Sequence, residues 1–268
     1  MYSRLLLISL FSLSLQAQPW YRLTMDVEGG FNAILGNQYQ SGSTGTRFNF
    51  ASEAKQNFLF PNWRASLGLN IYQRHDIELT YQPIFLDTLT IADRDLKFDD
   101  VTISKGSSFQ ARYFFPLYRL SYFYRLINLP NFFWSVGAGL QMRSASISFF
   151  DETTRKSFVQ TNIGPVPLLL TRLRYEFDNH LFMSLDAAGW WSPIPIANGS
   201  DKMTTGWIYD TSVRGGIHAV DWLDVYISTR LIGGGADGDG SKRTSGESYT
   251  YNTLNVLNFT TGLVFYVR

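Results

Sequence analysis

The sequence contains no cysteine among its 268 residues. Disulfide bonds, thiol catalysis, cysteine-ligated zinc and lipoprotein acylation are therefore excluded. Charged residues make up only 17% of the chain and the formal net charge is +1, which leaves no broad basic surface for nucleic acid. Beyond the N-terminus, no apolar run reaches the roughly 18 residues that a membrane-spanning helix needs. A helical membrane bundle is thereby excluded.

The chain is instead rich in hydrophobic side chains (45%) and in aromatic ones (16%). This composition excludes intrinsic disorder, because so much apolar surface drives a chain to fold. At roughly 150 residues per domain, the length allows one large domain or two small ones. The pattern along the chain must decide between them.

Residues 1–18 have the features of a secretory signal peptide. Arg4 supplies a positive charge, the stretch from Leu5 to Leu15 is apolar, and Ala17 is a small residue suited to cleavage. The apolar stretch is too short for a membrane anchor, and Pro19 would stop a helix from continuing. We therefore expect export of a mature chain that begins near residue 19.

The mature chain shows apolar residues at every second position and no sustained helical stripe, which predicts β-strands. The apolar faces of these segments contain 54 positions and no Asp, Glu, Lys or Arg, whereas the overall charged content would place about nine there. The alternating segments are 22–35, 63–72, 77–85, 118–126 (beginning near Ser107), 134–143, 167–177, 182–191, 209–218, 223–232 and 257–267.

The opposite faces of the same segments carry charge of both signs. A soluble barrel would turn the apolar faces inward, whereas a membrane barrel turns them towards lipid, where an arginine costs roughly 2 to 4 kcal/mol at mid-membrane. The predicted signal peptide favours the membrane arrangement. These faces hold nine arginines (22, 64, 119, 125, 143, 172, 174, 214 and 230) and seven acids (Asp26, Glu28, Glu78, Glu176, Asp186, Asp210 and Asp224).

The lengths of the connections agree with a membrane barrel, because short and long ones alternate along the chain. The short ones are 73–75, 128–131, 178–180 and 219–221, and the long ones are about 36–61, 86–106, 149–162, 192–205 and 233–251. This alternation is typical of barrels with tight periplasmic turns and longer outer loops. We therefore expect residues 19–268 to form a single domain, an all-β, transmembrane, antiparallel up-and-down barrel of about ten strands in a bacterial outer membrane.

Several strings also carry a family resemblance. Tyr118–Arg125 (YRLSYFYR), Val136–Gly139 (VGAG), Arg143–Ala145 (RSA) and Arg230 before Gly234–Asp237 (GGAD) resemble an uncharacterised family of bacterial outer-membrane β-barrel proteins. The resemblance covers about the C-terminal two-thirds and implies fold and location, with no activity to transfer. The chain end resembles the signal read by the barrel assembly machinery, although Arg268 stands where an aromatic residue is usual.

The candidate functional residues form a charge cluster on the lumen side of the barrel. Ten strands enclose little more space than eight-stranded barrels that side chains fill, so these residues can form an ion-paired plug. Alternatively, Arg119, Arg125 and Arg143 on adjacent strands bind or steer a small anion. The cluster comprises Arg119, Arg125, Arg143, Arg172, Arg174, Glu176, Asp186, Asp210, Arg214 and Arg230.

Other chemistry has weaker support in the sequence. His75 and His180 fall in periplasmic turns and His218 at the periplasmic end of a strand, away from any outer substrate. Asp186 and Asp210 are a carboxylate pair that could serve an outer-membrane hydrolase or acyltransferase. Two further acids near flexible glycines, Asp237 and Asp239, are weak calcium candidates; the residues point to no cofactor.

The leading hypothesis is a non-enzymatic barrel surrounded by outer-membrane lipid. Its lumen would be a narrow or plugged pore, or its outer loops would bind a surface ligand. The serine-, glycine- and threonine-rich outer loops can equally cap the barrel, because loops of this kind also shield a lumen.

Overall fold

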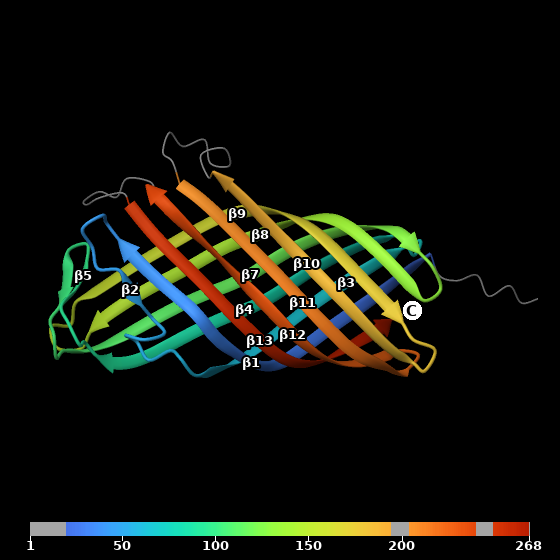
Figure 1. The fold of residues 1–268 in the computed structure, drawn as a ribbon, viewed down its shortest axis with the longest axis horizontal. Helices are drawn as coiled ribbons and strands as arrows, with labels where there is room; N and C mark the ends of the chain where they lie inside the picture. The colour runs from blue at the N-terminus through green and yellow to red at the C-terminus, as the bar shows by residue number, and fades with distance from the viewer. Residues whose placement is uncertain (1–19, 194–203, 240–248, 268) are drawn as a thin grey trace, which may run out of the picture.

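The computed structural model describes residues 20–193, 204–239 and 249–267, so the predicted signal peptide lies outside the described residues. Ten long antiparallel strands form one sheet, which closes into a barrel where β13 pairs with β1 (Figure 1). No helix long and apolar enough to cross a membrane occurs in these ranges. The long strands are β1 (Tyr21–Ser41), β3 (Leu59–Ile71), β4 (His75–Ile91), β7 (Ser108–Asn128), β8 (Phe132–Asp151), β9 (Ser157–Glu176), β10 (Leu181–Pro193), β11 (Thr204–Val220), β12 (Leu223–Asp239) and β13 (Tyr249–Val267), and the short ones are β2 (Phe48–Asn49), β5 (Leu96–Phe98) and β6 (Val101–Ile103).

The wall of the barrel is apolar outside and polar inside, which confirms the sequence-based fold class. On β1, Leu23, Met25 and Phe31 are about half exposed, whereas Glu28 and Asn32 are buried in the lumen. Side chains alternate across a strand, and each of the other long strands likewise turns its apolar set outward and its polar set inward. Charged side chains are buried and large apolar ones exposed, the reverse of a soluble protein.

Two belts of aromatic side chains border the apolar outer surface. On one side Trp63, Tyr81 and Tyr118 form a row across β3, β4 and β7, the first pair edge to face and the second tilted, with ring centroids 5.4 and 4.8 Å apart. Aromatic rings of this kind favour the boundary between lipid and water. The first belt, with Trp191, lies towards the long connections; the second comprises Trp20, Tyr72, Trp134, Phe177 and Trp222 near the short turns.

The short connections gather at one end of the barrel, here called the turn end, and the others at the loop end. In Figure 1 the turn end lies to the right with the C-terminus, and β2 and β5 lie at the left, at the loop end. The expected long connection over 149–162 was wrong: β8 runs to Asp151 and β9 starts at Ser157, which leaves a tight turn. In that turn burial raises the pKa of Asp151, but hydrogen bonds from Thr154 and Thr153 hold it below its usual value.

An aromatic plug fills the loop end of the lumen. It is built by β2 and its loop, by the β5–β6 hairpin and by the inner faces of β7, β8 and β9. Phe98 of the hairpin stacks face to face on Phe149 of β8, with ring centroids 3.8 Å apart. The rings of the plug are Phe48, Phe50, Phe98, Phe109, Phe149 and Phe158, all at most 4% exposed.

Candidate functional site in the barrel lumen

The inner wall below the aromatic plug carries a nearly balanced set of charges. Nine arginines and eight acids face inward along the described strands. The eighth acid is Asp76, which lies just before the segment expected to begin at Ile77 and shares its inward phase with Glu78. Asp76 accepts a hydrogen bond from Arg125 across the β4–β7 pair. The sequence signal for Asp76 was present, because it is two residues from Glu78.

One tier of this set crosses the lumen at Asp210 on β11. The carboxylate accepts two hydrogen bonds from Arg230 on β12, the Nε–Oδ1 distance being 2.6 Å. Arg119, from β7 on the opposite wall, lies 2.7 Å from the same carboxylate. Arg230 and Arg119 also donate to the side-chain oxygens of Gln82 and Gln141, at 2.7 Å each. We call these five residues the Asp210 tier; none is more than 8% exposed.

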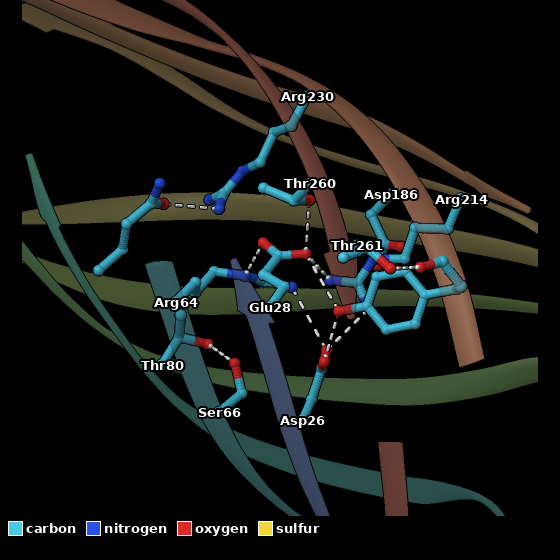
Figure 2. A network of polar contacts seen from close by, with 12 residues as sticks. Asp26, Glu28, Arg64, Ser66, Thr80, Asp186, Arg214, Arg230, Thr260 and Thr261 are labelled. Carbon is cyan, nitrogen blue, oxygen red and sulfur yellow. Dashed lines mark hydrogen bonds and ion pairs between the residues drawn. The ribbon is translucent and has the colours of Figure 1, made fainter. Parts of the chain in front are cut away.

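A second tier surrounds the two carboxylates of β1, as Figure 2 shows. Arg64 of β3 donates to Glu28 at 2.6 Å and to Asp26 at 3.3 Å. Arg214 of β11 donates to Asp26 at 2.8 Å from the far side. The hydroxyl of Tyr226 lies 3.0 Å from Glu28 and also contacts Asp26. Two arginines therefore neutralise two adjacent acids at the centre of the lumen.

Arg172 of β9 joins two more acids. It donates to Asp186 on the neighbouring β10 and, at 3.0 Å, to Glu78 on β4. Its guanidinium also lies 4.5 Å from the ring centroid of Phe123, a favourable cation–π position. This group completes a charged layer that reaches from β9 to β4.

The cavity left between these groups is small. It has a volume of about 40 Å³ and is lined by members of all three groups together with Leu170 and Ala188. A water needs roughly 10 to 15 Å³ on the same measure, so the cavity holds about three or four waters. Pockets that hold organic ligands are about ten times larger. This cavity among the described residues therefore has room for water and is too small for an organic substrate.

A separate group lies at the turn end, around His218 of β11. The two ring nitrogens of His218 lie 2.6 Å from Asp224 and 2.8 Å from Glu176. Arg174 donates to the same two acids, at 2.7 Å to Glu176 and 3.2 Å to Asp224. Both carboxylates are thus held by two basic partners, and the histidine lies where the sequence placed it, far from the loop end.

The ten residues of the predicted cluster all face the lumen, but they do not form one site. Arg119 belongs to the Asp210 tier, and Arg125 pairs with Asp76 near the turn end. Arg143 has no acid partner among the described residues and faces Leu117 and Gly164 across its two ladders. The three arginines considered as an anion site are therefore spread along the lumen.

The structure also shows where the other two predicted sites lie, the carboxylate pair and the calcium candidates. Asp186 is bound by Arg172, and Asp210 by Arg119 and Arg230, so each carboxylate already has its own ionic partner. Asp237 lies at the loop end of β12, where it accepts a hydrogen bond from Tyr249 at 3.0 Å. Burial and this bond raise the pKa of Tyr249. The side chain of Asp239 lies outside the described part, and the residues that are described contain no group of three metal-binding side chains.

The predicted cluster omitted the acids and the arginine that bind at the centre of the second tier. Asp26, Glu28 and Arg64 were on the predicted polar faces, but their meeting across the β1–β3 pair depends on register. Tyr226 lay on the same predicted polar face as Asp224 and Arg230, but nothing in the sequence indicated that its hydroxyl would meet Asp26 and Glu28 of β1. The partners across the lumen become visible only when the sheet is closed.

Comparisons with known proteins return similar barrels only at low scores. No family model matches the chain, and no curated protein matches it. Among solved structures, the outer-membrane protease OmpT from Escherichia coli has a TM-score of 0.40 at 11% identity, covering 92% of this chain and 97% of that one. A Pseudomonas aeruginosa FadL homologue has a TM-score of 0.35 at 9% identity, covering 91% and 89%. The Pseudomonas putida toluene transporter TodX has a TM-score of 0.30 at 11% identity, covering 93% and 90%. These similarities are too weak to indicate a shared function. The barrel fold is instead established by the closed ladder of paired strands.

Proposed function

We propose that the chain is a non-enzymatic outer-membrane barrel with a closed lumen, which acts as a binding protein and not as an open pore. The observation that carries the proposal is the Asp210 tier, a buried chain of side-chain contacts from one wall of the lumen to the other. The apolar outer face and its two aromatic belts support a membrane location. The predicted signal peptide supports export to it.

Charge pairing explains why such a lumen stays shut. Buried arginines and acids are stable only when each finds a partner, and removing one partner leaves an uncompensated charge. Opening a path would separate Asp210 from Arg119 or Arg230. Buried charges would then lose the partners that compensate them. The aromatic plug closes the loop end independently, since it shares no residue with the Asp210 tier.

Conductance in a planar bilayer tests the proposal directly. We expect the refolded wild-type protein to insert and remain silent, because both closures hold. The double variant Asp210→Ala and Arg230→Ala in a barrel that also lacks the Phe98 ring should show brief openings. Insertion is checked by protease protection of the strands. Steady anion-selective steps in the wild type, reduced by Arg143→Ala, would instead show that the arginines line a pathway.

A further inference from the structure

Two glycines interrupt the outer face of β12 just beyond the apolar band. Gly233 and Gly235 are an even number of residues from Leu231, which is 36% exposed on the outer wall, so they face outward as well. A glycine leaves the backbone of a strand uncovered and lets another group approach it closely. The neighbours on β11 are aromatic, since Tyr209 pairs with Gly233 and Trp207 pairs with Gly235.

The two rings occupy the space that side chains on the glycines would fill. A Cβ atom at Gly233 would lie 2.5 Å from the hydroxyl oxygen of Tyr209, and one at Gly235 would lie 2.6 Å from Cζ2 of Trp207. Both rings therefore lie across β12. Tyr209 is held there because its hydroxyl donates to Oδ1 of Asn255 on β13 at 2.6 Å. Both rings remain partly exposed, so they present an aromatic surface to the outside.

Polar side chains border the two rings on the side nearer the loop end. Asp237, the next outward residue of β12, is exposed and pairs with Tyr251 of β13. The guanidinium of Arg47 lies 3.9 Å from the ring centroid of Tyr251, and its Nε donates to Gln38 of β1 at 3.1 Å. Neither of these contacts of the Arg47 side chain is to an acid, so its charge has no acid partner in the described part of the chain. We call the combined surface the outer platform; it comprises Trp207, Tyr209, Tyr251, Arg47, Gln38 and Asp237.

The apolar band begins immediately on the other side of the rings. Leu231 pairs with Leu257 in the ladder positions next to the glycines. Beyond them Phe259 of β13 pairs with Phe31 of β1, and both are about half exposed. The outer platform therefore lies at the boundary where the acyl chains of the leaflet at the loop end meet their polar heads.

A sugar ring matches this combination of groups. One face of a pyranose is lined by C–H groups, which pack against the electron-rich face of an aromatic ring. Its hydroxyl groups hydrogen-bond to carboxylate and amide side chains such as those of Asp237 and Gln38. An arginine without an acid partner, such as Arg47, recognises a phosphate through several parallel N–H donors. An acyl chain alone would use the rings and leave all three polar side chains unused.

We propose that the outer platform binds the head of an anionic glycolipid, a sugar that carries a phosphate, from the leaflet at the loop end. The sugar stacks on Trp207 and Tyr209, and its phosphate is held by Arg47. The acyl chains lie along Leu231 and Phe259, so the head reaches the platform without leaving the membrane. The inference deepens the proposed function, because it names what the barrel binds, and it rests on the membrane location proposed there.

Native mass spectrometry of the whole barrel in neutral detergent tests the proposal. The probe is monophosphoryl lipid A, whose head is a glucosamine disaccharide with one phosphate. We expect the wild type to retain it about tenfold more tightly than phosphatidic acid, which has the phosphate and acyl chains but no sugar. Free glucosamine 1-phosphate at the same concentration should not displace the probe. Equal retention of phosphatidic acid would overturn sugar recognition, and displacement by the free sugar would overturn the lipid-borne source.

The aromatic part of the platform is tested by two tryptophan variants. Trp207→Leu should weaken retention of monophosphoryl lipid A about tenfold, because the sugar loses its stacking surface. Trp63→Leu is the matched control, since Trp63 is also a partly exposed tryptophan of the loop-side belt but lies on β3. Far-UV circular dichroism confirms that each variant keeps the barrel. Equal losses in the two variants would show a general effect of the belt and overturn the proposal.

The charged part has its own pair of variants. Arg47→Gln should weaken retention of the phosphorylated lipid about tenfold and leave its dephosphorylated form unchanged. The matched control is Arg112→Gln, because Arg112 also lies on the outer wall but is paired with Asp87. Retention that Arg47→Gln does not change would overturn the proposal. Conductance of the lumen has no influence on this measurement, so failure of the closed-lumen proposal is seen separately.

A third variant displaces a ring without removing it. The nearest atoms to a Cβ at Gly233 all belong to the side chains of Tyr209 and Asn255, so Gly233→Ala should push the Tyr209 ring aside and spare the backbone. We expect weaker retention of monophosphoryl lipid A, although every group of the platform is still present. Full retention would contradict the role of the flat Tyr209 ring.

Discussion

Asp210→Asn destabilises the barrel by about 3 to 5 kcal/mol, the range measured when one partner of a buried ion pair is removed. The substitution keeps the shape of the side chain and removes its charge. Arg119 and Arg230 then face each other in a buried layer without the carboxylate that both contact. Urea unfolding from lipid vesicles, followed by tryptophan fluorescence, measures the loss.

A matched control uses an ion pair of the same residue types on the outer wall. Asp87 and Arg112 are 2.9 Å apart, but the arginine side chain is 44% exposed. Solvent screening reduces such a pair to about 0 to 1 kcal/mol, so Asp87→Asn should be nearly neutral. Adding Arg230→Met to Asp210→Asn should recover part of the stability, because it removes one unpaired charge. Equal stability of Asp210→Asn and wild type would contradict the Asp210 tier as a closure.

The barrel itself could be predicted because one physical rule governs its membrane-facing half. Lipid outside and charge inside force a strict period of two, so ten segments could be found with their faces correct. β9 shows how far this extends: Leu169 is 64% exposed and Leu168 is buried, although both are leucines. Leu168 is an even number of residues from the inward-facing Arg172 and Arg174, and this spacing distinguished it from Leu169.

The strand ends at the loop side could not be found in the same way, because the pattern reverses there. On β7, Leu120 and Tyr122 point outward, but Ala111 and Tyr113 point into the core that includes the aromatic plug. Beyond the apolar band the outer wall meets water, so the inward face becomes the apolar one. When the apolar residues move from the outward to the inward positions of one strand, the alternating sequence pattern is interrupted and the strand seems to end. The connection at 149–162 was therefore expected to be long.

Contacts across the lumen also escaped prediction, because they depend on how many residues each strand is shifted against the next. Arg230 and Gln82 are 148 residues apart in sequence and lie on opposite walls. Composition predicted that interior charges would pair, but not which ones.

Phe98→Ala should release the β5–β6 hairpin from the loop end. Phe98 is fully buried and stacks on Phe149, and removing a buried phenylalanine costs about 3 to 5 kcal/mol. The hairpin has two strands of three residues and cannot hold its shape without this packing. The substitution should free the hairpin and leave the barrel folded, since the hairpin is not part of the ten-stranded ladder.

Trypsin added to the inserted protein measures this release, because Lys97 lies within the hairpin and Lys105 directly after it. In the wild type, the Thr46 amide donates to the Lys97 carbonyl and the Lys97 amide donates to the Thr46 hydroxyl, so the segment is held and cleavage should be slow. Phe98→Ala should speed cleavage at both lysines at least tenfold, whereas Phe85→Ala on the outer wall should not. The variant should remain silent in a bilayer, because the Asp210 tier is intact. Conductance from Phe98→Ala alone would show that the aromatic plug, and not the charged tier, is what closes the lumen.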